Sequence, residues 1–512
     1  MNPRLVHGAA LVLLAFAGIG VQSYYWPQIA DDSFIFYRYA QNLAAGEGLR
    51  WNVGDTPVEG FSSPLWVLVL GLLTVCGAPV ITASKILGVA TYGLLVLGIG
   101  SMTYRLASNR AAAIASMLAA VLCEPLNYWA PSGMETSSYV ALLVWSTHAL
   151  LTQRFGLATA LLAVTALARP EAPGMVLVAL GLLPITAGHQ QTRARLVKIS
   201  ALALLPLLVY LAFRLSYFGE FLPNTYYAKV GGGLQTRLEN GLLYIAPAML
   251  IWAGGLLALF LCRIKPPVDR SGLRPLLLVF ALATAALIPP LWSGGDWMWH
   301  LRFLCPCLPF LIVFVAAITA RLANSRGLVA ILPAAIAVIG LGYVGWVNPS
   351  AITKGLSGEH LSIAEIQEGR MTAVSQKVAY FLRQRGQSTD LVAVNHAGAL
   401  PYYSQMPTLD MTGLNDHHIA HQAEGGLHGK FDPEYVLSKQ PQFIVLNSVV
   451  KPNSHQDRRG KPIQRFYYHG YWAGETALWQ HPQFSKEYRF VPQFWTWNWV
   501  SPRYILVAER IR

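Results

Sequence analysis

Charged residues are scarce in this chain of 512 residues. They make up only 12% of it, about half of the roughly 25% found in soluble domains, while 54% of the residues are hydrophobic. Apolar runs near the ~20 residues needed to cross a bilayer recur from Leu5 to Trp346. An ordinary soluble protein is therefore excluded, and the runs predict a multi-pass α-helical membrane protein.

Cysteine is scarce as well. None of the five cysteines lies beyond residue 307, so the polar stretch over residues 347–512 is expected to fold without disulfides. Cys305 and Cys307 flank Pro306 inside an apolar run, where helix packing is the favoured interpretation because a metal site needs about four ligands. Internal repeats and low-complexity segments are lacking too.

Basic residues outnumber acidic ones by 38 to 25. Such an excess would suit nucleic acid binding, but much of it lies in short loops between apolar runs, where positive charge sets the orientation of a membrane protein. No nucleic acid partner is expected. The basic loops expected on the cytoplasmic side contain Arg105/Arg110, Arg154, Arg193/Arg195/Lys198, Arg263/Lys265/Arg270/Arg274 and Arg321/Arg326.

The alternation of basic and other loops predicts the topology. Leu5 to Val21 is expected to be the first span, followed by an exterior loop over residues 23–63. Residues 64–80 are expected to form a re-entrant helix, because a span there would place every later basic loop outside. About eleven spans result, in a transmembrane domain over residues 1–346 that precedes an exterior domain over residues 347–512.

The polar C-terminal region has the pattern of a mixed domain. Short β-branched runs such as Leu391 to Val394 and Phe443 to Leu446 alternate with helix-like stretches such as Ile363 to Arg383. This predicts an α/β or α+β module. Its last third is rich in aromatic residues, which suit sugar faces, an aromatic core or a surface that rests on the membrane.

Two adjacent carboxylates, Asp31 and Asp32, follow the first apolar run directly. Like charges beside hydrocarbon are costly, so their presence needs a reason. Asp31 could cap a helix over Ser33 to Leu43, with Asp32 solvated in its first turn. Alternatively, one of the two could be a general base that takes the proton of an acceptor hydroxyl.

Several motifs in a fixed order add a resemblance. The strings are DDSFIFYRYAQNLAAGEGLRWN (31–52), PVEGFSSPLW (57–66), SGMET (132–136), ARPE (168–171), LPNTYYAK (222–229), GGDWMWHLRFL (294–304) and LDMTGLNDHHIA (409–420). In this order they resemble the GT-C superfamily of membrane glycosyltransferases, and more narrowly the terminal β-arabinofuranosyltransferases of mycobacterial cell-wall synthesis and their bacterial relatives. The resemblance covers most of the chain and implies a bacterial cell membrane location.

The resemblance implies a polyprenyl-phosphate-linked sugar as donor, transfer with inversion, and one aspartate of the pair as base, and arabinofuranose is the sugar that it suggests. A departing lipid phosphate needs cationic or hydrogen-bonding groups. The candidates for this role are Lys229, Arg302, Arg169, Arg38 and His300, of which Arg169 and Arg302 could instead snorkel or pair with Glu171 or Asp296. Membrane lipids are the expected surroundings, and the acceptor could be a glycan, lipid or protein.

Further polar residues of the motifs are candidates for binding the sugar or the acceptor. Glu59 and Glu135 could do so, although salt bridges are the favoured use of both. The full set is Glu59, Glu135, Asn224, Tyr226, Tyr227, Asp296, Asp410, Asn415 and Asp416.

A metal is not required by the sequence. A divalent cation could lie near Asp31 and Asp32. His417 and His421 would share a helical face, but the third and fourth ligands of a site there cannot be identified, and Asn415 or Asp416 also fits an N-cap.

Two other functions would explain parts of the sequence. A transporter or flippase should carry ionisable groups near the middle of the bilayer and often has two related halves. A scaffold would explain the aromatic C-terminal region but not the charged groups gathered in several exterior loops. A transferase is favoured over both.

Overall fold

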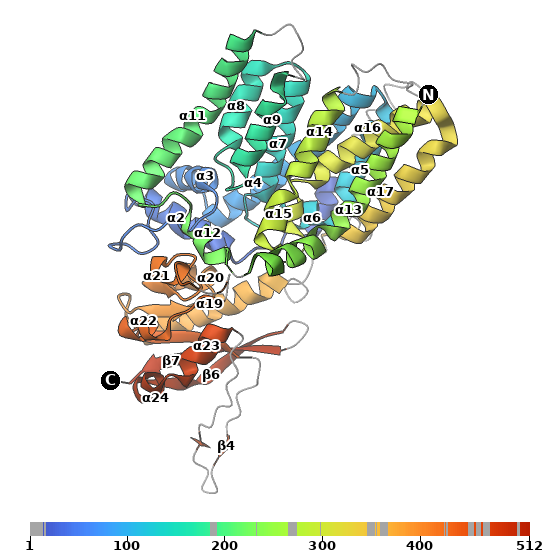
Figure 1. Ribbon diagram of the computed structural model, residues 1–512. Helices are drawn as coiled ribbons and strands as arrows, with labels where there is room; N and C mark the ends of the chain where they lie inside the picture. Colours follow the sequence, from blue (N-terminus) through green and yellow to red (C-terminus); the bar gives the residue numbers. More distant parts are fainter. Residues whose placement is uncertain are drawn as a thin grey trace.

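The computed structural model describes residue 14 and residues 17–511, except for 185–191, 232, 265–273, 297, 299, 346–353, 355, 359–366, 424, 426–428, 449–454, 457–461, 464–471 and 499–501. It divides into a helical bundle and a smaller domain built on a sheet (Figure 1). Most of the first predicted span, Leu5 to Val21, lies outside the described residues.

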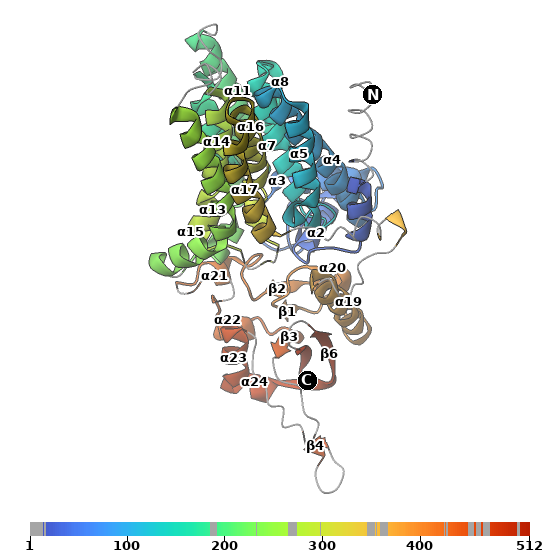
Figure 2. The same ribbon diagram turned by 90° about the vertical axis from the view of Figure 1, so that its right-hand side faces the viewer.

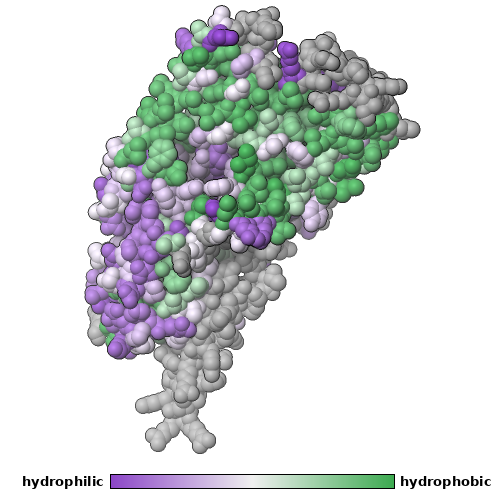
Figure 3. All heavy atoms as spheres, viewed as in Figure 1, coloured by the Kyte–Doolittle hydropathy of each residue, from purple (hydrophilic) through white to green (hydrophobic). Residues whose placement is uncertain are grey.

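The bundle contains the apolar helices. Its elements are α2 (Ser33–Ala44), α3 (Pro64–Val75), α4 (Val80–Ala107), α5 (Arg110–Leu122), α6 (Glu124–Tyr128), α7 (Thr136–Leu151), α8 (Phe155–Thr165), α9 (Ala172–Gly181), α11 (Arg193–Tyr217), α12 (Asn224–Lys229), α13 (Leu234–Ile264), α14 (Arg274–Ala285), α15 (Ile288–Ser293), η3 (Arg302–Leu304), α16 (Leu308–Arg326), η4 (Gly327–Ala330) and α17 (Ile331–Val344). Helix α4 packs on α5, α7 and α16, while α13 packs along α17. On the face shown in Figure 3, hydrophobic side chains predominate over the bundle, and hydrophilic ones predominate among the coloured atoms of the C-terminal domain.

Four described helices are long and apolar enough to cross a bilayer. They cover Val80–Ala107, Arg193–Tyr217, Leu234–Leu261 and Arg274–Ser293, and six shorter apolar helices accompany them. A multi-pass helical membrane protein is therefore what the fold shows. The count of about eleven spans stays a prediction.

Helix α3 is the segment that the sequence predicts to be re-entrant. Ser63 accepts a hydrogen bond from the N–H of Trp66, and Pro64 occupies the first turn, so the helix has a well-formed start. Its 12 residues reach about 18 Å, which is short of the ~30 Å hydrocarbon layer. The helix packs against α2 and is followed directly by the long helix α4.

The C-terminal domain is built on a five-stranded mixed sheet of order β2-β1-β3-β7-β6. Strands β1, β2 and β3 are parallel, and the hairpin of β6 and β7 joins β3 antiparallel. The elements are α19 (Gln367–Arg385), β1 (Val392–Val394), α20 (Ala399–Ser404), β2 (Thr408–Asp410), α21 (His417–Ala420), α22 (Pro433–Ser438), β3 (Phe443–Ser448), β4 (His455–Gln456), β5 (Pro462–Ile463), α23 (Ala473–Gln480), α24 (Pro482–Glu487), β6 (Tyr488–Asn498) and β7 (Pro502–Arg510).

The two domains share part of their core. Ala397, Ala399, Leu414 and Ala420 of the C-terminal domain belong to the same buried hydrophobic cluster as the bundle. Helices α2 and α20 lie against each other at this junction, and both views place them between the bundle and the sheet (Figures 1 and 2). Residues from both domains therefore surround the loop that carries the acidic pair.

Candidate active site

The two aspartates of the pair point to different surroundings. Asp31 is 4% exposed, and its two carboxylate oxygens accept hydrogen bonds from the backbone N–H groups of Gly398 (3.2 Å) and Ala399 (2.9 Å). A Cβ atom on residue 398 would lie 2.0 Å from the carbonyl oxygen of Asp31, so only glycine allows this approach. Burial, together with Asp32, raises the pKa of Asp31 to about 7 although both N–H groups oppose the shift.

Asp32 occupies the N-cap position of α2 but makes no capping hydrogen bond with its side chain. Its side chain is 15% exposed, and Oδ2 lies 3.8 Å from the guanidinium Nη1 of Arg302. The N-cap residue is thus Asp32 rather than the expected Asp31, and its carboxylate makes no capping hydrogen bond, so simple capping does not explain the pair. Asp32 therefore faces a cation and accessible space, whereas Asp31 faces the C-terminal domain.

Three cations gather near Asp32, and we call Lys229, Arg302 and Arg169 the cation cluster. Arg302 is 3% exposed, and its Nε donates to Asp296 at 2.8 Å. Burial lowers the pKa of Lys229, Asp32 and Asp296 oppose this shift, and Arg302 and Arg169 add to it. These interactions place Lys229 within electrostatic reach of the other members.

The members of the cation cluster differ in how firmly they are paired. Arg169 is bound by both Glu135 and Glu171, and the second oxygen of Glu135 has no hydrogen-bond partner among the described residues. Arg302 has Asp296 as its close partner. No carboxylate of the described residues lies within 4.0 Å of the Lys229 ammonium, so Lys229 is the cation best able to accept an added anion.

The direction of Arg302 depends on two strained backbone residues directly before it. His300 and Leu301, directly before it, have φ angles of 56° and 47°, in the left-handed region that costs about 1–3 kcal/mol for such residues. The indole N–H of Trp129 donates to the carbonyl oxygen of His300 at 3.0 Å, and the Arg302 guanidinium lies over the Trp129 ring. This ring and the η3 turn together fix the direction of the Arg302 side chain.

Arg38 does not join the cation cluster, contrary to the expectation from sequence. Its guanidinium donates to the carbonyl oxygens of Trp51, Pro401 and Met406 and to the side chain of Asn52, at 2.9–3.0 Å. Arg38 therefore links α2 to the C-terminal domain through buried hydrogen bonds. We call this region the interdomain seam: Asp31, Arg38 and Asn52 bound to residues 398–408.

His300 is also separate from Asp32. Its ring stacks on Tyr128, and Nδ1 lies 3.3 Å from Glu124. Its described partners are therefore those of the α6 turn, and its expected role at the phosphate is not supported by these contacts.

Glu59 and Asn224 serve as structural links. Glu59 is 2% exposed and paired with Arg214, and it also accepts from Tyr210. The Asn224 amide donates to the carbonyl oxygens of Gly413 (2.8 Å) and Leu414 (3.0 Å), which ties α12 to the C-terminal domain. The favoured salt-bridge explanation thus describes Glu59 well, as it does Glu135.

Asp410, Asn415 and Asp416 organise a turn. Asp410 is fully buried and accepts from the backbone and side chains of Thr412 and Asn415. Asp416 caps α21 through the N–H of Ile419, as one of the two expected alternatives had it. Tyr227 packs on the ring of His421, next to Tyr226. These residues shape the junction beside α12 rather than presenting free carboxylates.

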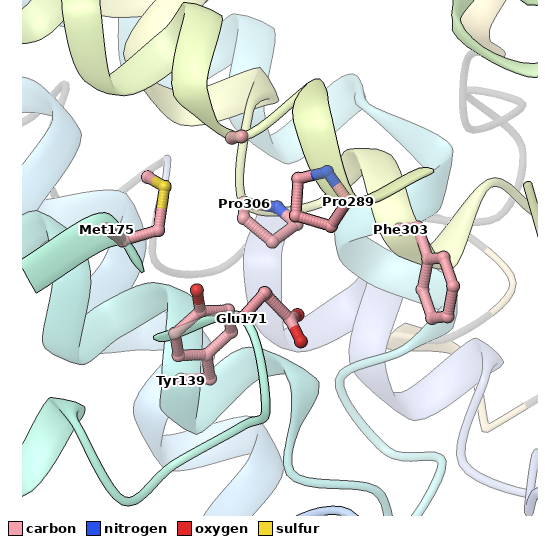
Figure 4. A pocket seen from close by; sticks show the side chains of 7 residues that line it. Tyr139, Glu171, Met175, Pro289, Phe303 and Pro306 are labelled. Atoms are coloured by element: carbon pink, nitrogen blue, oxygen red, sulfur yellow. The ribbon is translucent and has the colours of Figure 1, made fainter. Parts of the chain in front are cut away.

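Two cavities adjoin the Arg169–Glu171 ion pair. One of about 240 Å³ is lined mostly by apolar residues of α3, α9 and α11 and of the loops that follow α8 and α11, with Arg169 and Arg214 in its wall. The other, of about 30 Å³, has room for about one water molecule and lies among Tyr139, Glu171, Pro289 and Phe303 (Figure 4). The Arg169–Glu171 ion pair contributes to both walls and so separates the two spaces.

For some residues of the site the sequence gives little or no signal. The backbone of Gly398 and Ala399 carries no side-chain signal, and Arg214 stands out only as a charge near the end of an apolar run. Glu220 lies with His417 and His421 in a group able to hold a metal ion, but in the sequence it falls outside the family-like motifs, two residues before the one that begins at Leu222.

The chain matches known proteins over most of its length. It is 27% identical to the terminal β-(1→2)-arabinofuranosyltransferase of Mycobacterium tuberculosis, covering 85% of this chain and 73% of that protein. Residues 361–507 match a family described as a domain of unknown function, DUF8728.

Solved structures share the fold at low identity. ArnT from Cupriavidus metallidurans bound to undecaprenyl phosphate is 12% identical, with a TM-score of 0.54, covering 98% of this chain and 97% of ArnT. The oligosaccharyltransferase AglB from Archaeoglobus fulgidus, in complex with an inhibitory peptide and a dolichol-phosphate, is 12% identical, with a TM-score of 0.53, covering 86% of this chain and 69% of AglB. These matches do not favour a transporter. They confirm the predicted resemblance: the chain shares the fold of the membrane proteins ArnT and AglB, and its sequence is similar to that of the mycobacterial arabinofuranosyltransferase over most of its length.

Proposed function

We propose that this protein transfers a sugar from a polyprenyl-phosphate donor to a hydroxyl group of a cell-envelope glycan or glycoconjugate, with inversion at the sugar carbon. The name of the mycobacterial relative supports arabinofuranose as the sugar. The lipid phosphates bound to ArnT and AglB support the donor class. The bacterial cell membrane is the proposed location, with the C-terminal domain outside.

One observation carries the mechanism: Asp32 is partly accessible and lies 3.8 Å from Arg302, within reach of the field of Lys229. A base and an anion acceptor are thereby placed side by side. Asp31 lacks this combination, because it is buried and bound to the backbone of the C-terminal domain. We therefore assign the role of base to Asp32 and the role of anchor to Asp31.

The proposed reaction is a single displacement at the anomeric carbon. Asp32 takes the proton of the acceptor hydroxyl as its oxygen forms a bond to the anomeric carbon. The bond from that carbon to the phosphate oxygen breaks, and its electron pair leaves with the polyprenyl phosphate. Lys229 and Arg302 hold the charge that develops on the departing oxygen. Because attack and departure occur on opposite faces of the carbon, the configuration inverts.

The larger cavity beside Arg169 is the proposed place for the first part of the donor lipid. Its lining is mainly apolar, and at about 240 Å³ it is below the ~300–1,000 Å³ of a complete ligand pocket, so it suits one portion of a larger molecule. Helix α11, which lines this cavity, also carries exposed apolar side chains, among them Leu205, Leu208 and Val209. A lipid could thus enter from the side while its phosphate reaches the cation cluster.

A transfer assay with the purified full chain tests this function. The assay offers a panel of polyprenyl-phosphate sugars and a glycan acceptor, and NMR of the product gives sugar, linkage and anomeric configuration. We expect transfer with inversion, lost in Asp32→Asn and kept in Glu47→Gln, whose carboxylate is exposed in the same exterior loop. Transfer with retention would refute the mechanism, and no transfer from any member of the panel would refute the donor class.

The divalent cation expected near Asp31 and Asp32 is tested in the same assay. No group of three ligands is found there among the described residues. Activity that is lost with EDTA and restored by Mg²⁺ or Mn²⁺ would support the cation, and full activity in EDTA would remove it from the mechanism.

A further inference from the structure

Two histidines and one glutamate meet where the domains join, away from Asp32. Glu220 lies in the loop between α11 and α12 of the bundle, and His417 and His421 lie at the start and just after the end of α21. Glu220 Oε1 is 2.9 Å from His417 Nε2 and 3.6 Å from His421 Nε2. The three ligand atoms all lie within 4.8 Å of one another.

A hydrogen bond of the His421 ring fixes which of its two nitrogens carries the proton. Its Nδ1 lies 2.9 Å from the carbonyl oxygen of His417, and a carbonyl only accepts, so Nδ1 carries a proton. In the neutral ring Nε2 then has a lone pair, which faces the carboxylate oxygen of Glu220. Two electron-rich atoms at 3.6 Å call for a cation or an additional proton between them. A backbone carbonyl that fixes the tautomer in this way is also the usual support of a metal-bound histidine.

The donor set and spacing fit a transition metal. Zinc binds nitrogen and carboxylate oxygen at about 2.0–2.2 Å, so tetrahedral ligands stand about 3.3 Å apart, between the two distances found here. Two imidazoles favour Zn²⁺ over Mg²⁺ or Ca²⁺, which prefer oxygen ligands. The i and i+4 spacing of the histidines brings their rings into a stack with centroids 4.0 Å apart.

We propose that Glu220, His417 and His421 bind one zinc ion that links the two domains. No fourth His, Cys, Asp or Glu joins the group among the described residues, which leaves a coordination position for water. Lys430 donates to the carbonyl oxygens of Tyr227 and Ala420, so the same two segments already meet at this point. The metal would hold α12, at whose end Lys229 lies, against the C-terminal domain. The site is independent of the transfer mechanism.

Zinc content of the purified full chain tests the proposal. The protein is stripped with EDTA, loaded with ZnCl₂ in the presence of excess MgCl₂, desalted and measured by inductively coupled plasma mass spectrometry. We expect about one zinc per chain in the unmodified protein and less than about 0.1 in His417→Ala, His421→Ala and Glu220→Gln, since three ligands are the fewest in protein zinc sites. Isothermal titration with ZnCl₂ should show an affinity loss of at least about 100-fold in each variant.

His418 supplies the matched control. It lies on the same helix with its side chain 44% exposed, against 55% for His417, and it pairs with Asp432 at 2.8 Å. His418→Ala should keep its zinc. Zinc that persists in all variants, zinc lost equally in His418→Ala, or no zinc in the unmodified protein would each overturn the site; the last would leave an ion pair between Glu220 and protonated histidine. Melting temperature with and without ZnCl₂ separates metal loss from misfolding.

Discussion

The interdomain seam and the cation cluster show how two adjacent aspartates come to differ. At the seam, Asp31 is buried and accepts hydrogen bonds from the backbone of residues 398 and 399, and Arg38 binds the carbonyl oxygen of Pro401 nearby. At the cluster, Asp32 keeps part of its surface and faces Arg302. Successive residues at the start of a helix point about 100° apart, so a step of one residue is enough to separate the buried carboxylate of Asp31 from the partly exposed carboxylate of Asp32.

The largest effect is expected from Asp32→Asn. Removing a general base lowers rates by about 100- to 10,000-fold, so we expect kcat for sugar transfer to fall about 1,000-fold. The melting temperature should stay within a few degrees of the original, because the Asp32 side chain makes no capping bond. Purified variants compared at saturating donor provide the measurement. A rate within tenfold of the original would remove Asp32 as the base.

Lys229→Met should act next most strongly and mainly on the donor. A hydrogen bond to a charged group contributes about 1.5–3 kcal/mol, so the KM for the polyprenyl-phosphate sugar is expected to rise about 10- to 100-fold. The acceptor KM should change little. Lys198→Met, which alters an exposed lysine of α11, serves as control. An unchanged donor KM would mean that the phosphate binds elsewhere.

Substitutions at the seam should affect stability more than chemistry. Arg38→Ala leaves several buried carbonyl oxygens without their donor, at a cost of about 1–3 kcal/mol each, and should lower the melting temperature by at least about 5 °C. Gly398→Ala should act in the same direction, because the added methyl group meets Asp31. Transfer per folded molecule should remain within about tenfold of the original. Arg193→Ala, at an exposed position, provides the control.

The smallest predicted effect is a pH dependence of stability. The pKa of Asp31 is raised to about 7 in the folded protein and is about 3.9 in an unfolded chain, so the folded state binds its proton more tightly. This stability is fully present below about pH 4 and is lost as pH rises to about 7. Asp31→Asn should flatten the decline of melting temperature over this range. Glu475, whose pKa burial also raises to about 7, adds its own slope, and Glu475→Gln measures that part separately.

Much of the fold was predictable because its signals are local. Apolar runs predicted a helical membrane protein, and β-branched runs predicted strands at 391–394 and 443–446, where β1 and β3 are found. The helix expected over Ser33 to Leu43 is α2, one residue longer. The order of the motifs predicted the resemblance to membrane glycosyltransferases, because the motifs are spread over most of the chain.

The roles within the site were less predictable, because they depend on contacts between distant residues. Arg38 and Arg169 look alike in the sequence, yet Arg38 binds carbonyl oxygens of residues 401 and 406, and Arg169 binds Glu135 and Glu171. The anchor of Asp31 is a backbone segment more than 360 residues away, for which no side-chain pattern exists. Glu220 likewise meets His417 only through the docking of the two domains.

The division of work between the two aspartates is tested most directly by comparing Asp31→Asn and Asp32→Asn in one transfer assay, with each rate normalised to the folded protein in the sample. We predict that Asp31→Asn keeps at least about a tenth of the original kcat, and that Asp32→Asn keeps no more than about a thousandth. The reverse order, with Asp31→Asn inactive and Asp32→Asn active, would contradict the assignment of Asp32 as the base.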